Sequence, residues 1–191
     1  SLFDLDAMIS PLARRGPDYQ DKWISKNKTI FFGHTRLSIL DLSKNGAQPM
    51  SSNNDRYMIS YNGEIYNHID LRLRLKNLSN FDVWNSTSDT ETLINYFQIM
   101  GVTKTLKDIQ GMFAFAIYDK LDEVLYLARD PAGEKPLYYY QDSNYFLFSS
   151  DILSLKKFKY FNSDLDYEAI NFYKRYGFIK SPNTIYKKVK K

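Results

Sequence analysis

The segment Tyr61–Arg72, YNGEIYNHIDLR, contains an adjacent Asn62-Gly63 pair whose two donors could stabilise a developing negative charge. Asparagine offers a side-chain amide and glycine a backbone N–H that no Cβ obstructs, and oxyanion holes use donors of these kinds. Asn-Gly between two strand-like segments is also the strongest short-range signal for a β-hairpin turn. We therefore expect short strands at Tyr57–Tyr61 and Glu64–Tyr66, with a turn between them that carries both donors.

Two charged side chains could hold the ends of a small zwitterion. Arg36, in RLSI, can bind a carboxylate through its guanidinium fork, and Asp89, in SDTE, can bind an ammonium group. Each has a structural alternative, which is an ion pair for Arg36 and a helix cap for Asp89. For the two histidines we expect a packing role at His34, not that of a general base, and a surface position at His68.

The composition restricts the class of protein. The 191 residues are 43% hydrophobic and 16% aromatic, which suits one soluble globular domain with a sizeable core. No cysteine is present, which excludes disulfides and thiolate metal sites, and two isolated histidines make a poor metal cluster. The longest uncharged apolar run, Gly111–Tyr118, is far shorter than the roughly 20 residues of a membrane helix. We expect no metal, no membrane span and a reducing, cytoplasmic setting.

The net charge of +4 comes partly from lysines near the C-terminal end, such as Lys187 and Lys188. A solvated tail explains them better than a nucleic-acid groove, because no basic stripe with interleaved stacking aromatics surrounds a binding motif. We therefore expect no nucleic-acid partner.

The elements that must position these residues follow from hydrophobic periodicity. Helices are predicted near both ends and in the middle of the chain, at Asp4–Ala13, His68–Leu78, Thr90–Met100, from Asp151, and at Asp166–Tyr176. Ser88 or Asp89 could cap the third of them. Strands are predicted at Thr29–Leu40 and in four later runs, FAFAIYD, EVLYLAR, PLYYY and YFLFSS. Helices, a block of strands and further helices favour an α+β fold with mostly antiparallel sheets.

Seven motifs occur in one fixed order along the chain: RGPD (15–18), GHTRLSILDLS (33–43), GAQPM (46–50), YNGEIYNH (61–68), SDTE (88–91), GMFAFAIYD (111–119) and RDPAGEKPLYY (129–139). Their joint occurrence is highly specific although each alone is weak, and the resemblance that they carry covers nearly the whole chain. The sequence resembles the glutaminase domain of glutamine-hydrolysing asparagine synthetases, a class II glutamine amidotransferase. The resemblance implies the N-terminal nucleophile hydrolase fold, a four-layer α/β/β/α sandwich of two mostly antiparallel sheets.

The resemblance also implies a role for each candidate residue. Asn62 and Gly63 would form the oxyanion hole, while Arg36 and Asp89 would bind the α-carboxylate and α-ammonium of L-glutamine. The remaining substrate-binding positions would be Leu37, Ile39 and Glu64, partly through backbone groups. The nucleophile of this family is an N-terminal cysteine, so we expect the strand that carries it to lie upstream of Ser1 and the chain shown to be inactive.

On this resemblance, residues 1–180 are the amidotransferase domain without its first strand, and residues 181–191 begin a connector to a missing synthetase domain. Glutamine would be hydrolysed to glutamate and ammonia, and the ammonia used for ATP-dependent amidation of aspartate on that domain, where ATP and Mg would bind. No cofactor is expected in the present domain, and a homodimer is one assembly that the resemblance allows. Two alternatives stay open: the glutaminase domain of a sugar or surface-polysaccharide amidotransferase, and a non-catalytic glutamine-binding module.

Overall fold

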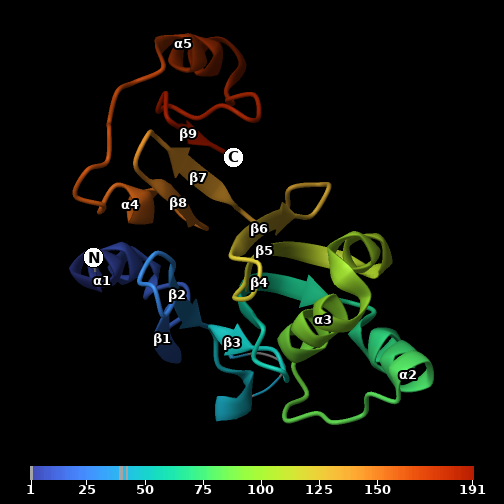
Figure 1. The fold of residues 1–191 in the computed structure, drawn as a ribbon. Coiled ribbons are helices and arrows are strands. Elements are labelled where there is room, and N and C mark those ends of the chain that lie inside the picture. Colours follow the sequence, from blue (N-terminus) through green and yellow to red (C-terminus); the bar gives the residue numbers. More distant parts are fainter. Residues whose placement is uncertain (1, 39–40, 42) are drawn as a thin grey trace. The chain divides into compact units, whose positions relative to one another are not determined.

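The computed structural model describes residues 2–38, 41 and 43–191, and the chain folds into two compact units (Figure 1). The central unit is Ala13–Lys135, and the terminal unit joins the N-terminal residues up to Leu12 with Pro136–Lys191. Every described residue that the sequence singles out for chemistry lies in the central unit. The predicted boundary at residue 180 stays a prediction.

The central unit contains two antiparallel sheets and two long helices. The strands β1 (Tyr19–Ile24) and β2 (Phe31–Arg36) pair with each other. A four-stranded sheet has the order β3 (Met50–Ser51), β4 (Tyr57–Ile65), β5 (Gly111–Asp119) and β6 (Val124–Arg129). The helices are α2 (His68–Ser79) and α3 (Asp89–Asp108), and a 3-10 turn, η2, covers Lys44–Gly46.

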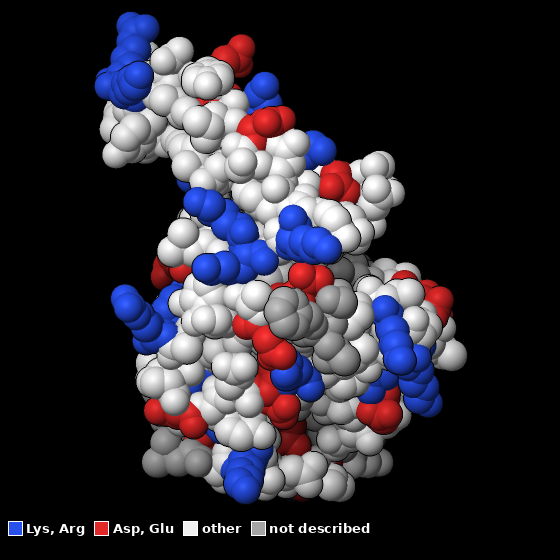
Figure 2. Space-filling model, turned by 90° about the vertical axis from the view of Figure 1, so that its left-hand side faces the viewer, with Lys and Arg blue, Asp and Glu red and all other residues white. Residues whose placement is uncertain are grey.

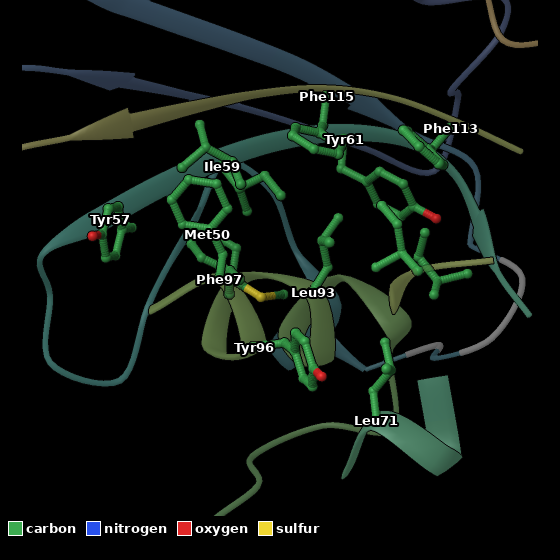
Figure 3. Packing of buried hydrophobic residues seen from close by; sticks show 14 of the residues in the cluster. Met50, Tyr57, Ile59, Tyr61, Leu71, Leu93, Tyr96, Phe97, Phe113 and Phe115 are labelled. Carbon is green, nitrogen blue, oxygen red and sulfur yellow. The ribbon is translucent and has the colours of Figure 1, made fainter. Parts of the chain in front are cut away.

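One face of the four-stranded sheet forms the core with α2 and α3, because alternate side chains of a strand point to the same face. Figure 3 shows Ile59 and Tyr61 of β4 directed toward Leu93 and Phe97 of α3. The intervening β4 residues Ser60, Asn62 and Glu64 consequently face the opposite side of the sheet. Strand β4 thus carries the side chain of Asn62, a candidate site residue, on the face opposite this core.

The terminal unit has its own small sheet, with the order β8 (Phe146–Ser149), β7 (Tyr138–Gln141) and β9 (Val189–Lys190). Its helical elements are α1 (Leu2–Ile9), η1 (Ser10–Leu12), α4 (Ile152–Leu155) and α5 (Tyr167–Tyr176). Its buried cluster comprises Tyr140, Leu155, Tyr186 and Val189.

Most of the predicted elements are confirmed. The helix predicted from His68 begins there, and Ser88 caps α3 by accepting a hydrogen bond from the Glu91 N–H. The four later strand runs are β5 to β8. The predicted helix end at Met100 coincides with a kink inside α3, where Gly101 has non-helical dihedral angles (φ 77°, ψ 170°), and a second helical stretch continues to Asp108. Strands β1, β3 and β9 were not predicted.

The predicted hairpin turn at Asn62-Gly63 is wrong. Both residues lie inside β4, a continuous strand of nine residues, and pair with Ala114 and Phe113 of β5. Gly63 does not have a positive φ, which a type I′ turn would require. The pairing partners are some fifty residues away in sequence, so long-range strand pairing overrides the local turn signal.

The fold class is α+β with antiparallel sheets, as predicted. Within the described part of the chain, no helix is long and apolar enough to cross a membrane. On the face displayed in Figure 2, acidic side chains lie among the lysines and arginines. The expectation of no nucleic-acid partner stays a prediction.

Candidate active site

Asn62 lies in the middle of β4 and presents its side chain on the face opposite the core. Its backbone is fixed by register with Ala114 of β5. The side chain is partly exposed, and within the described residues its amide has no hydrogen-bond partner. The strand backbone therefore holds a donor that no described residue uses.

The outer edge of β4 leaves a second donor unused. The Tyr61 N–H donates to Gln48 Oε1 (2.7 Å), and the Ile65 N–H donates to Asp89 Oδ2 (2.9 Å). Gly63 lies between these residues, so its N–H points to the same edge, away from β5. Strand β3 does not reach this far, since its pairing ends at Ile59, and no described residue accepts from the Gly63 N–H. Asn62 and Gly63 thus offer two adjacent free donors.

The glycine at position 63 is required by the closeness of β5. A Cβ there would lie 2.2 Å from the Met112 carbonyl oxygen and 2.7 Å from Phe113 Cα, both of which are backbone atoms. The sequence prediction assigned the lack of a Cβ to close approach of the substrate. The structure shows a cross-strand reason as well, so any larger residue would push β4 and β5 apart at the candidate oxyanion hole.

Asp89 is the first residue of α3 and is buried, with 5% exposure. Its Oδ2 accepts hydrogen bonds from the Tyr61 hydroxyl (2.7 Å) and from the Ile65 N–H. The helix cap is Ser88, so the alternative role of Asp89 as the cap is excluded. Burial, together with the charge of Asp89, raises the pKa of Tyr61, which therefore stays a neutral donor. Asp89 consequently ties α3 to the β4 edge on both sides of Gly63, and no described residue is bound to its Oδ1.

Arg36, at the end of β2, donates to two backbone carbonyls, those of Asp41 and Ser43, the latter at 2.8 Å from Nη1. Among the described carboxylates none lies within salt-bridge distance, so the ion-pair alternative is not observed. Asp41 in turn accepts the Thr87 N–H through Oδ2 (3.0 Å). Thr87 precedes Asp89 by two residues. The loop at Asp41 therefore connects Arg36 with Asp89, the two residues predicted to bind the charged ends of the substrate.

Two side-chain contacts join the β1–β2 sheet to the four-stranded sheet. The Trp23 ring, whose Cα partner is Phe32, packs on Tyr118 at 5.9 Å, and Tyr118 pairs with Met58 of β4. Two residues further along both strands, His34 Nδ1 lies 3.1 Å from Ser60 Oγ. Arg36 follows His34 by two residues in β2, and Asn62 follows Ser60 by two residues in β4.

His34 is the most strongly perturbed histidine of the site. Burial, and secondarily the positive charge of Arg36, lowers its pKa from 6.5 to about 4. It is therefore neutral at neutral pH and pairs with Ser60 on the second face of the sheet. The expected packing role stays a prediction.

We expect His34→Asn to remove part of the acid sensitivity of the fold. Between pH 6.5 and about 4 the unfolded state binds a proton at His34 that the folded state does not, so stability falls as the pH is lowered. The contribution of this group to the fall should be about 3 kcal/mol. Chemical denaturation at pH 7 and pH 4.5 measures it; equal pH slopes for the two proteins would contradict the assignment.

The remaining predicted site residues that the structure describes differ in how far they are exposed. Leu37 is 56% exposed, and Glu64 is partly exposed on the same face as Asn62. Ile39 lies outside the described residues. The surface position expected for His68 is wrong in one respect, because its Nδ1 is buried without a partner among the described residues. Burial lowers the pKa of His68, while the charge of Asp89 opposes that shift.

Two further side chains, which the sequence does not single out, hold the β4 edge and the start of α3 in place. Gln48 was noted only within GAQPM, and its amide both accepts from Tyr61 N–H and donates to Thr90 Oγ1 (3.3 Å). Arg72 was noted only as the end of a motif, and it binds the segment before α3. Neither role has a sequence signal, because the partners are distant in sequence. No cluster of three or more His, Asp and Glu able to hold a metal ion occurs in the described residues.

The chain is similar in sequence to glutamine-hydrolysing asparagine synthetases. A putative glutamine-hydrolysing asparagine synthetase 2 of Methanocaldococcus jannaschii is 36% identical over 96% of this chain. Asparagine synthetase 1 (glutamine-hydrolysing) of Bacillus subtilis is 39% identical, also over 96%. The chain spans 38% and 28% of the lengths of these two relatives.

A solved structure shows the same fold at lower identity. It is the glutamine phosphoribosylpyrophosphate amidotransferase of B. subtilis, with a TM-score of 0.54, 22% identity and coverage of 65% of this chain and 28% of the other. The family model for the glutamine amidotransferase domain matches residues 2–191. The chain therefore belongs to the glutamine amidotransferase domain family.

Proposed function

We propose that this domain binds L-glutamine and positions its side-chain amide for hydrolysis to glutamate and ammonia. The observation that carries the proposal is the pair of unused donors at Asn62 and Gly63, which lie beside the buried carboxylate of Asp89. A carbonyl oxygen that acquires negative charge needs two such donors fixed in advance. The names of the relatives support glutamine as the substrate.

The α-carboxylate and the α-ammonium of glutamine are each assigned to a side chain of opposite charge. Arg36 uses two of its five N–H donors on the carbonyls of Asp41 and Ser43, which leaves the rest of its fork for the α-carboxylate. Asp89 uses one oxygen internally and can offer the other to the α-ammonium. Leu37, Ile39 and Glu64 are proposed to line the same site.

The nucleophile of the proposed reaction is a cysteine, and this chain contains none. The residues of this chain are proposed to bind the substrate and to stabilise the oxyanion. Turnover must therefore be tested in a form of the protein that carries the nucleophile. Binding can be tested with the chain itself.

The fate of the ammonia is proposed from the relatives. Their names, glutamine-hydrolysing asparagine synthetase, support use of the ammonia to make asparagine. We propose that the ammonia serves ATP-dependent amidation of aspartate, with ATP and Mg bound on a synthetase domain of the same polypeptide. The reaction is proposed to take place in the cytoplasm, which agrees with the absence of cysteine. That absence also favours one second candidate, a glutamine-binding module without catalysis.

Titration of the 191-residue chain with L-glutamine and L-asparagine, followed by NMR, tests the proposal. Glutamine should bind about tenfold or more tightly than asparagine, because one missing methylene withdraws the amide from the Asn62 and Gly63 donors. Shift changes should centre on β4 and the start of α3. Equal affinity for the two amides, or no binding of glutamine, would overturn the proposed substrate.

A further inference from the structure

Arg72 of α2 makes two hydrogen bonds to the segment that leads into α3 and one to the first turn of α3 itself. Its Nε donates to Thr92 Oγ1 (2.7 Å), its Nη1 to the Ser86 carbonyl (3.0 Å) and its Nη2 to the Ser88 carbonyl (2.8 Å). The guanidinium also lies 4.0 Å from the centre of the Trp84 ring. The side chain is only 15% exposed, so these contacts are shielded from water.

Glu91 holds the same segment from the other side. Its Oε1 accepts the Asn85 N–H (2.9 Å), and its Oε2 accepts both the N–H and the hydroxyl of Ser86 (2.8 Å each). Arg72 Nη2 and Glu91 Oε2 are 3.9 Å apart, so the two charges also attract each other. Residues 85–88 are consequently fixed through their donors by Glu91 and through their carbonyls by Arg72.

Asp89 follows this segment directly. Its position relative to β4 depends on where the Ser88 carbonyl is held, and that carbonyl is a partner of Arg72. Burial lowers the pKa of Arg72, while the negative charges of Glu91 and Asp89 oppose the shift, which agrees with a guanidinium close to both carboxylates.

We propose that Arg72 is a positioning residue for the amino end of the substrate: it fixes the start of α3 so that the Asp89 carboxylate meets the α-ammonium of glutamine. This inference rests on the proposed function. Arginine suits the task because its planar fork reaches two carbonyls and a hydroxyl at once, which the single ammonium of lysine cannot do with the same geometry.

The test compares Arg72→Gln with two matched controls in NMR titrations of the 191-residue chain. Arg74→Gln removes the same charge from an exposed position of the same helix. Tyr96→Phe removes a buried hydrogen bond (2.6 Å to Asp108) from α3, away from its start. Each protein is titrated with L-glutamine and with glutaramate, which is glutamine without its α-amino group.

Arg72→Gln should weaken glutamine binding on the order of tenfold, because a misplacement of about 1 Å is costly at a fixed clamp. It should leave the affinity for glutaramate unchanged, since that ligand makes no ammonium contact. Both controls should bind both ligands like the parent chain. If Arg72→Gln does not fold, Thr92→Val, which removes the acceptor of Nε and the long hydrogen bond from the Thr92 hydroxyl to the Ser88 carbonyl (3.4 Å), should show the same selective loss to a smaller degree.

Equal weakening for glutamine and glutaramate would overturn the inference and assign Arg72 a general structural role. So would unchanged glutamine affinity in Arg72→Gln. Failure of the proposed function would give a different result, because the unaltered chain would then not bind glutamine at all.

Discussion

Asn62→Ala is expected to lower glutaminase turnover by about 10²–10³-fold, the usual effect of deleting one oxyanion donor. The measurement requires a form of the protein that carries the cysteine nucleophile. The affinity of the Asn62→Ala variant for glutamine should stay nearly unchanged, as measured by titration of the 191-residue chain that carries this substitution. The loss should therefore appear in kcat, with KM little affected.

The reason for this split is that the Asn62 amide is free in the unliganded protein and matters most when the carbonyl oxygen acquires charge. Arg36 and Asp89, by contrast, hold the ground state and the transition state alike. Stability should change little, because the Asn62 backbone stays paired with Ala114 and alanine is tolerated in a strand. Asn62→Asp should reduce turnover further, since it places an anion opposite the oxyanion.

Ser60→Ala is a suitable control, because Ser60 occupies the same face of β4 two residues away and, among the described residues, its hydroxyl is hydrogen-bonded to His34 alone. It should retain most of the turnover. If folded Asn62→Ala turns over glutamine normally, Asn62 is no oxyanion donor, and its part in β4 is purely structural.

Asp89→Ala should weaken glutamine binding by about 30- to 5,000-fold, since removing one side of a desolvated charge pair costs about 2–5 kcal/mol. Stability should fall as well. The Tyr61 hydroxyl and the Ile65 N–H share Asp89 Oδ2, and each buried donor left without a partner costs about 1–3 kcal/mol. Titration and chemical denaturation measure the two effects.

Asp89→Asn separates charge from structure, because the amide oxygen can still accept from Tyr61 and Ile65. This variant should keep most of the stability but lose most of the affinity for glutamine. Asp108→Asn, at the other end of α3, is the matched control and should bind glutamine normally. Unchanged glutamine affinity in Asp89→Asn would remove Asp89 from the binding site.

Local sequence signals were sufficient where the stabilising contacts are themselves local. The Ser88 cap involves residues within one helical turn and could be predicted. The strand runs from Gly111 onward are long enough for their apolar content to identify them. Strand β1 could not be predicted, because four of its six residues are exposed and no alternation marks it.

For the site, the sequence by itself determined which residue types are present and in what order: a donor pair at Asn62-Gly63, a guanidinium at Arg36 and a carboxylate at Asp89. Only the tertiary structure decided how they are used. Pairing with β5 draws Asn62-Gly63 into a continuous strand, because many ladder and core contacts outweigh the turn preference of two residues. Gln48 and Asp89 occupy the neighbouring N–H groups and leave that of Gly63 free, an outcome that depends on contacts 13 and 24 residues apart in sequence.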